Sequence, residues 1–229
     1  MFPIGDERVQ GGPPAFVTFG LIALNVLAFF VELAQPSEAA LQSFIQAWGV
    51  VPWEYSAVRD LPPTIPLPFW STLLTSMFLH GGWMHLGGNM LYLWIFGDNL
   101  EKVMGAVRFA IFYLVCGLVA SFAHIIFGPG STVPAVGASG AISGVLGGYL
   151  VLFPRNQVRV LTRGGIAHVP AIVVLGFWIV IQLFNGVGSM ATTSETGGGG
   201  VAYMAHIGGF AAGLVLVKLM ASRQRPALA

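Results

Sequence analysis

Apolar stretches of membrane-spanning length recur along the chain and are separated by shorter polar connections. A helix needs about 20 mainly apolar residues to cross a bilayer, because the hydrocarbon core is about 30 Å thick. The predicted spans cover residues 16–33, 83–96, 107–127, 139–153, 166–186 and 201–220. This pattern predicts an all-α, polytopic membrane protein: a six-helix bundle at 16–220, a short cytoplasmic segment at 1–15 and a cytoplasmic tail at 221–229.

The fourth predicted span is unusually short. It begins at Ser139 and ends before Pro154, and a helix of about 15 residues rises only about 22 Å. Since this is less than the hydrocarbon thickness, we expect Ser139 several ångströms below one membrane surface. Irregular backbone at that depth is tolerated only where protein covers it or where it lines a wet cavity, which favours a functional site there.

Two connections differ from the others. Residues 34–66 contain several prolines and the aromatics Trp48, Trp53 and Tyr55, so we expect a long loop with short pieces lying at the membrane surface. Residues 187–200 include four consecutive glycines, a composition typical of a flexible loop. Because this loop directly precedes the sixth span, we hypothesise that it acts as a lid admitting substrate and water.

Composition agrees with a membrane protein and predicts its orientation. The chain is 55% hydrophobic and 8% charged, whereas a soluble domain is typically about a quarter charged. A formal net charge of +1 gives no indication of a nucleic-acid partner. With both termini in the cytoplasm, every Lys and Arg except Arg59 lies inside, as the positive-inside rule predicts. We expect an integral, multi-pass protein of the cell membrane.

In this orientation the chemistry-bearing residues gather toward the outer side. The second, fourth and sixth spans begin there, and the polar residues near their starts are His85, Asn89, Ser139 and His206. His85 and Asn89 are four residues apart and therefore share one helix face. Polar residues from three helices at one depth indicate a site rather than random packing.

The stretch Gly137-Ala138-Ser139-Gly140 places a hydroxyl at the start of a helix. Backbone N–H groups there have no partner within the helix and can hold an anion, and a nucleophile beside an anion site suits acyl transfer. Helix packing is an alternative interpretation, because Gly140, Gly144 and Gly148 have the four-residue spacing of close helix contacts in membranes.

Other kinds of membrane-embedded hydrolysis fit the sequence poorly. The His-Glu-x-x-His zinc motif is missing, and no acidic residue lies centrally in a span, as an aspartyl pair would require. His80 and His85 are poorly spaced to share a metal from one helix face. We therefore expect no metal.

Serine chemistry remains, because a serine hydroxyl needs only a base within hydrogen-bond reach. Histidine can serve as that base near neutral pH, so Ser139 and His206 are the predicted catalytic pair. The candidate oxyanion donors are the backbone N–H of Ser139, the imidazole of His85 and the amide of Asn89. Gly137 and Gly140 would allow close approach of backbone and substrate.

These residues fall in motifs that resemble the rhomboid intramembrane serine proteases. The resemblance covers nearly the whole chain and rests on the stretches 75–85, His85–Asn89, Gly137–Gly140 and Ala205–Gly213. It implies that Ser139 is the nucleophile, that His206 is the base, and that His85 and Asn89 assist the oxyanion. It also implies cleavage of transmembrane protein substrates within the lipid bilayer, without a cofactor.

Two departures from the family pattern bear on details. Some members carry an aromatic residue four positions after the nucleophile, where this chain has Ser143, so support for His206 must come from elsewhere. The first loop has no Trp-Arg pair; the nearest stretch is Trp53-Glu54-Tyr55. The alternatives are a catalytically inactive rhomboid-like protein that binds transmembrane helices, and a small transporter, which would be expected to show repeated halves.

Overall fold

The computed structural model describes residues 2–9, 11, 14–191 and 202–221. Its helices are α1 (Phe16–Leu33), α2 (Glu38–Trp48), α3 (Pro52–Ala57), α4 (Thr72–Thr75), α5 (Trp83–Met104), α6 (Ala106–Phe127), α7 (Ser139–Leu152), α8 (Ala171–Ala191) and α9 (Tyr203–Met220). Short 3-10 turns, η1 (Phe69–Ser71) and η2 (Ser76–Phe78), flank α4. The strands are β1 (Phe2–Asp6), β2 (Gln157–Thr162) and β3 (Gly165–Pro170).

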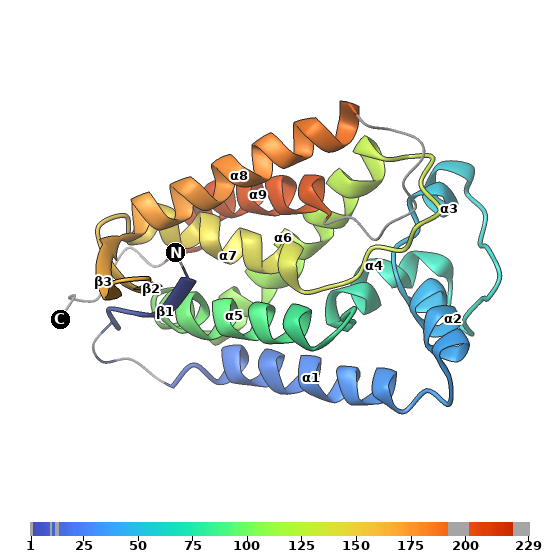
Figure 1. Ribbon diagram of the computed structural model, residues 1–229, viewed down its shortest axis with the longest axis horizontal. Helices are drawn as coiled ribbons and strands as arrows, with labels where there is room; N and C mark the ends of the chain where they lie inside the picture. Colours follow the sequence, from blue (N-terminus) through green and yellow to red (C-terminus); the bar gives the residue numbers. More distant parts are fainter. Residues whose placement is uncertain (1, 10, 12–13, 192–201, 222–229) are drawn as a thin grey trace.

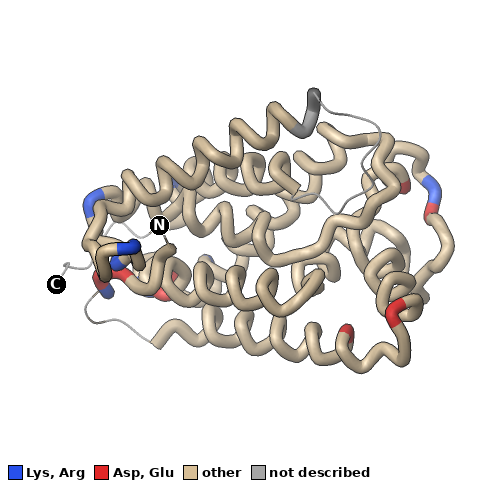
Figure 2. Tube along the Cα trace, viewed as in Figure 1, with Lys and Arg blue, Asp and Glu red and all other residues tan. Residues whose placement is uncertain are grey.

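The long helices run side by side along the long axis of the molecule (Figure 1). Within the described residues, α1, α6, α8 and α9 are long and apolar enough to cross a membrane, and α7 is a shorter apolar helix. Charged residues gather toward the two ends of the bundle (Figure 2). The protein is therefore mostly helical and has the helices of a multi-pass membrane protein.

Helix α7 occupies the centre of the bundle, and its contact with α9 is made backbone to backbone. A Cβ added at Gly147 would lie 2.3 Å from the carbonyl oxygen of Phe210, and one at Gly213 would lie 2.0 Å from that of Gly144. A side chain at either position would force the helices apart. The glycines of α7 therefore serve close helix packing, as the packing interpretation predicts. This role does not conflict with a chemical role for Ser139 at the start of the helix.

A three-stranded antiparallel sheet in the order β1-β2-β3 covers the end of the bundle opposite Ser139. The expectation of a purely α-helical chain is wrong here, because β1 lies within residues 1–15 and the hairpin β2–β3 follows the fourth predicted span and extends into the fifth. In β2, Val158 and Val160 are buried while Arg159 is exposed. This two-residue alternation is typical of a strand.

Three predicted boundaries also need correction. The fifth span begins at Ala171 and not at residue 166, because β3 occupies residues 165–170. The second helix continues past residue 96 to Met104. Helix α8 reaches Ala191, so the proposed lid at 187–200 begins inside a helix. The rest of that segment lies outside the described residues, and the lid stays a prediction.

A polar network joins the sheet to the helices. The Asp6 carboxylate accepts hydrogen bonds from the Asn99 amide at 2.8 Å and from the Tyr149 hydroxyl at 2.5 Å, and the Asn99 side chain also accepts from the backbone N–H of Val9 at 2.7 Å. Burial raises the pKa of Asp6 to about 7. The carboxyl-terminal part of α7 is thus fixed to the sheet.

At the opposite end, the long connection between α1 and α5 contains α2 and α3, which confirms the expected loop with short helical pieces. Val50 pairs with Ala135 in an isolated antiparallel bridge, and the Trp53 N–H donates to the carbonyl of Ser131 at 3.0 Å. These bonds join the first loop to the segment that leads into α7, and so they help to position Ser139.

Candidate active site

Ser139 and His206 meet at the starts of two adjacent helices. Ser139 is the first residue of α7, and His206 lies in the first turn of α9. The Nε2 atom of His206 is 2.8 Å from the Oγ atom of Ser139, within the reach expected of a nucleophile and its base. The close α7–α9 contact described above brings together two residues that are 67 positions apart in the chain.

Gly137 shapes the entry into α7. Its φ of +125° is a conformation that residues with a side chain rarely adopt, and its N–H donates to the carbonyl of Ser76 at 2.8 Å. A Cβ at Gly137 would lie 2.7 Å from His85 Nε2 and 3.6 Å from Asn89 Nδ2. Glycine therefore lets this backbone pass directly over the two predicted oxyanion donors.

His85 is oriented by its own helix start. The Gly81 N–H donates to His85 Nδ1 at 3.3 Å, so a neutral ring carries its proton on Nε2, the atom nearest Gly137. The His80 ring packs edge-on against His85 with 5.0 Å between ring centroids, and the His80 N–H donates to Glu32 at 2.9 Å. His85 Nε2 is thus available as a donor on the side facing the chain that leads to Ser139.

Asn89 supplies a second donor in the same place. The residue is buried, and its Nδ2 atom has no hydrogen-bond partner among the described residues. Leaving an amide donor unpaired in a buried position is costly, and such a donor is what a developing oxyanion needs.

Gly140 has different surroundings from Gly137. A Cβ at Gly140 would lie 2.6 Å from the Cβ of Ala120, so this glycine lets α6 and α7 approach each other closely.

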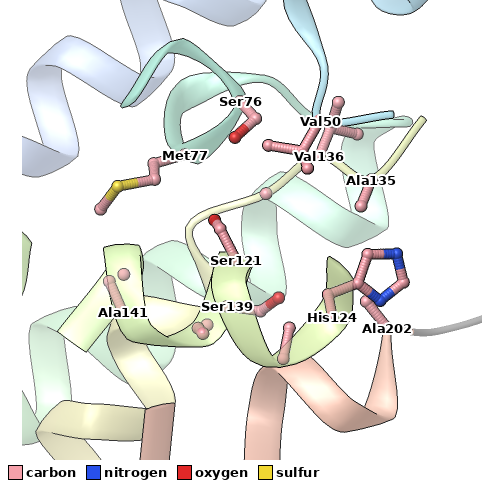
Figure 3. Close-up of a pocket in the computed structure, with 15 residues that line it drawn as sticks. Val50, Ser76, Met77, Ser121, His124, Ala135, Val136, Ser139, Ala141 and Ala202 are labelled. Carbon is pink, nitrogen blue, oxygen red and sulfur yellow. The ribbon is translucent and has the colours of Figure 1, made fainter. Parts of the chain in front are cut away.

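A cavity of about 30 Å³ opens beside Ser139. Ser139, Ser121 and His124 line one side of it, and Ser76 and Val136 line the other (Figure 3). A volume of this size holds one or two water molecules, and its hydroxyl and imidazole groups provide the polar partners that a water needs. Ser139 therefore borders a space that water can occupy.

The side chains that contact His206 from α8 were not identified from the sequence. Gln182 Oε1 lies 2.8 Å from His206 Nδ1, and the Trp178 ring lies over the imidazole with 5.9 Å between centroids and 37° between planes. Ser143 instead donates its hydroxyl to the carbonyl of Ser139 at 2.6 Å. The available signal was a polar amide, Gln182, four residues after a tryptophan in an apolar span.

No group of three or more His, Cys, Asp or Glu side chains in the part of the chain that the structure describes could hold a metal ion. The expectation that the protein works without a metal or other cofactor stays a prediction.

The fold and this site together define a class: a mostly helical, multi-pass membrane protein with a serine–histidine pair at the start of a short central helix. Residues 68–223 match the Rhomboid domain. The chain therefore belongs to the rhomboid family.

Similar proteins include two from Bacillus subtilis and one from yeast. Rhomboid protease GluP of B. subtilis is 33% identical over 174 residues, covering 76% of this chain and 32% of the relative. Putative rhomboid protease YdcA of B. subtilis is 31% identical over 150 residues, covering 64% and 65%. Rhomboid protein 1, mitochondrial, of Saccharomyces cerevisiae is 30% identical over 148 residues, covering 63% and 40%. The chain thus spans between about a third and two thirds of the length of these relatives.

Proposed function

We propose that the protein is an intramembrane serine endopeptidase that cleaves peptide bonds in or near the transmembrane segments of membrane proteins. The observation that carries this proposal is the 2.8 Å contact between Ser139 Oγ and His206 Nε2 inside a bundle of apolar helices. Membership of a family whose relatives include a protein named as a rhomboid protease supports it.

In the proposed reaction, Ser139 Oγ attacks the carbonyl carbon of the scissile bond while its proton passes to His206 Nε2. The oxyanion that forms is held by the backbone N–H of Ser139 and by the His85 and Asn89 side chains. The C–N bond then breaks, and His206 gives its proton to the leaving amine. A water molecule hydrolyses the acyl-enzyme by the same steps, and the cavity beside Ser139 is a route for it.

The proposal also places the protein in the membrane. We take α5 and α7 as spanning elements in addition to α1, α6, α8 and α9, which gives a six-helix bundle. The 14 residues of α7 rise about 21 Å, which leaves Ser139 below the surface if the sheet end lies at the cytoplasmic face. Both termini are then cytoplasmic, the site faces the outer side, and the proposed location is the cell membrane.

Cleavage of a panel of single-span substrates in liposomes tests this function. The purified protein should cut at least one substrate, and Ser139→Ala should not. Ser56→Ala is a matched control because Ser56 is exposed on α3, outside the site. If the wild-type protein retains substrates without cutting them, it is an inactive rhomboid-like protein that binds transmembrane helices. If Ser139→Ala cuts as well as the wild type, the serine assignment is wrong.

A further inference from the structure

Gln182 completes a chain of three side chains from three helices. Its amide oxygen lies 2.8 Å from His206 Nδ1, and the opposite ring nitrogen of His206 lies 2.8 Å from Ser139 Oγ. Gln182 is buried, with 8% of its surface exposed. The imidazole therefore has a hydrogen-bond partner at each nitrogen, and the partner on the far side from the serine is an uncharged amide.

The oxygen of an amide can only accept a hydrogen bond, and a neutral imidazole has one N–H and one lone pair. When Gln182 Oε1 accepts from Nδ1–H, the lone pair of His206 is on Nε2 and faces the Ser139 hydroxyl. If the amide nitrogen faced the ring instead, Nδ1 would be the acceptor and Nε2 would carry the proton. His206 could not then remove the proton of Ser139.

We propose that Gln182 is a positioning residue that holds His206 in the tautomer and orientation of a general base, which makes Ser139, His206 and Gln182 a triad with a neutral third member. This inference rests on the proposed function and adds a residue to its site. An amide suits this depth because burying an ionised carboxylate within a membrane is costly. It fixes the ring as a carboxylate does in a soluble serine hydrolase, but without a charge.

The position of Gln182 is set by one face of α8. Trp178 packs on His206 and on Phe210, with centroid distances of 5.9 and 6.1 Å. A Cβ at Gly186 would lie 3.0 Å from Met204 and 3.1 Å from Ile207, both on α9. Trp178, Gln182 and Gly186 are spaced by four residues and so share the helix face that contacts α9.

The opposite face of α8 is exposed, with Phe177 59% and Phe184 78% accessible. Helix α8 thus lies on the outside of the bundle and meets α9 along a single face. An outward displacement of α8 would move the Gln182 oxygen away from His206. The ability of His206 to accept the proton of Ser139 therefore depends on the position of α8.

Substitution of Gln182 tests the inference. Gln182→Met keeps the length of the side chain but loses the strong acceptor, whereas Gln182→Glu keeps an acceptor. Leu183→Met is the matched control on the same helix, since Leu183 is 45% exposed. Two measurements are made in liposomes: kcat and KM for a single-span substrate across pH, and the rate at which a fluorophosphonate probe labels Ser139, which reports on activation of the serine without a peptide.

Gln182→Met should lower kcat and the labelling rate on the order of 10- to 100-fold, with KM within about 2-fold, while Leu183→Met behaves as wild type. Gln182→Glu should keep kcat and the labelling rate closer to the wild type than Gln182→Met does, because its carbonyl oxygen can still accept a hydrogen bond from His206 Nδ1. The other titratable neighbours of His206 are His85 and His124; both are the same in every variant, so differences in rate between the variants report on position 182.

A Ser139-dependent enzyme in which Gln182→Met keeps the wild-type kcat would overturn the inference and leave the proposed function intact. A wild-type protein that neither cleaves nor labels would overturn both. If Gln182→Met fails to fold, as judged by circular dichroism and gel filtration, Gln182→Leu replaces it: a kcat at least 10-fold below the wild type with unchanged KM supports the inference, and a wild-type kcat overturns it.

Discussion

The two ends of α7 carry two different kinds of polar cluster. At the sheet end, the Asp6 carboxylate collects hydrogen bonds from Asn99 and Tyr149. At the other end, Ser139 bonds to His206, which in turn bonds to Gln182, and none of these three side chains is acidic. The acidic cluster lies where strands and charged residues gather (Figure 2), and the neutral one lies at the start of the short helix.

The difference follows from the cost of charge in an apolar surrounding. A cluster near the membrane surface can include a carboxylate, because water and arginines are close, and it can be used to fix helices and strands together. A reactive cluster at membrane depth does better with groups that are neutral at rest. The Asn89 amide nitrogen is buried and has no hydrogen-bond partner among the described residues. The neutral end of α7 thus has an unpaired hydrogen-bond donor nearby, as a site for a developing oxyanion would.

The largest expected effect comes from removing the serine–histidine contact. Ser139→Ala and His206→Ala should each lower cleavage by on the order of 10³-fold or more, and the double variant should be no worse than either single one, because residues that act as a unit are not additive. Initial rates in liposomes measure this, with folding checked by thermal unfolding. Independent, multiplying losses would show that the two side chains do not act together.

A smaller loss is expected from the oxyanion donors. Asn89→Ala and His85→Ala should each lower kcat by about 100-fold, near 3 kcal/mol, with little change in KM, because the donors bind the transition state more strongly than the substrate. Steady-state kinetics on one single-span substrate separates the two parameters. A raised KM with unchanged kcat would instead assign these side chains to substrate binding.

The helix contact between the two clusters can be tested through stability. Gly213→Ala places a methyl group where the carbonyl oxygen of Gly144 now lies, so α7 and α9 must separate, at a cost of about 1–3 kcal/mol. Thermal unfolding should show the loss, and cleavage should fall with it. Gly20→Ala, in α1, is the matched control because nothing lies within 4 Å of its added Cβ. Equal unfolding temperatures for the two variants would refute the close contact.

The acidic cluster should show itself in the pH dependence of stability. The pKa of Asp6 is raised by burial from 3.8 to about 7, and Asp98 adds to the rise while the hydrogen bond from Tyr149 and the charge of Arg8 oppose it. The folded state therefore holds a proton that the unfolded state has lost between about pH 4 and pH 7, and stability falls as pH rises through this window.

Thermal unfolding between pH 4 and pH 8 measures this effect, which should amount to a few degrees. Asp6→Asn should make the profile shallower, whereas Glu38→Gln, at the exposed start of α2, should leave it unchanged. An equally steep profile in Asp6→Asn would mean that another group is responsible.

Several features could be predicted from local patterns alone. The bounds of α1 agree with the apolar run at 16–33, and α7 begins at Ser139 as expected. These elements have strong periodicity or clear breaks, such as Pro154 after α7. The four polar residues expected at one depth are also brought near one another: Ser139 meets His206, and His85 and Asn89 lie beside Gly137.

Other features depend on contacts between distant parts of the chain. The strand β2 has a clear alternation of valines, but it lies between two predicted spans, where a connection is expected, and it pairs with β1, which is about 150 positions away. Gln182 stands in an apolar run that also contains Asn185. Which of these amides faces the bundle is decided by how α8 packs on α9, and a single sequence does not contain that information.

Helix α7 also acts as a spacer of fixed length. Its Tyr149 end is held by Asp6 and Asn156, and its Ser139 end carries the proposed nucleophile, so the helix sets how far the Ser139 hydroxyl lies from the sheet. One added residue in α7 would raise that hydroxyl by about 1.5 Å and turn it by about 100°, away from His206. Under the proposed function, the depth at which a substrate is cut is therefore set by the number of residues in one helix.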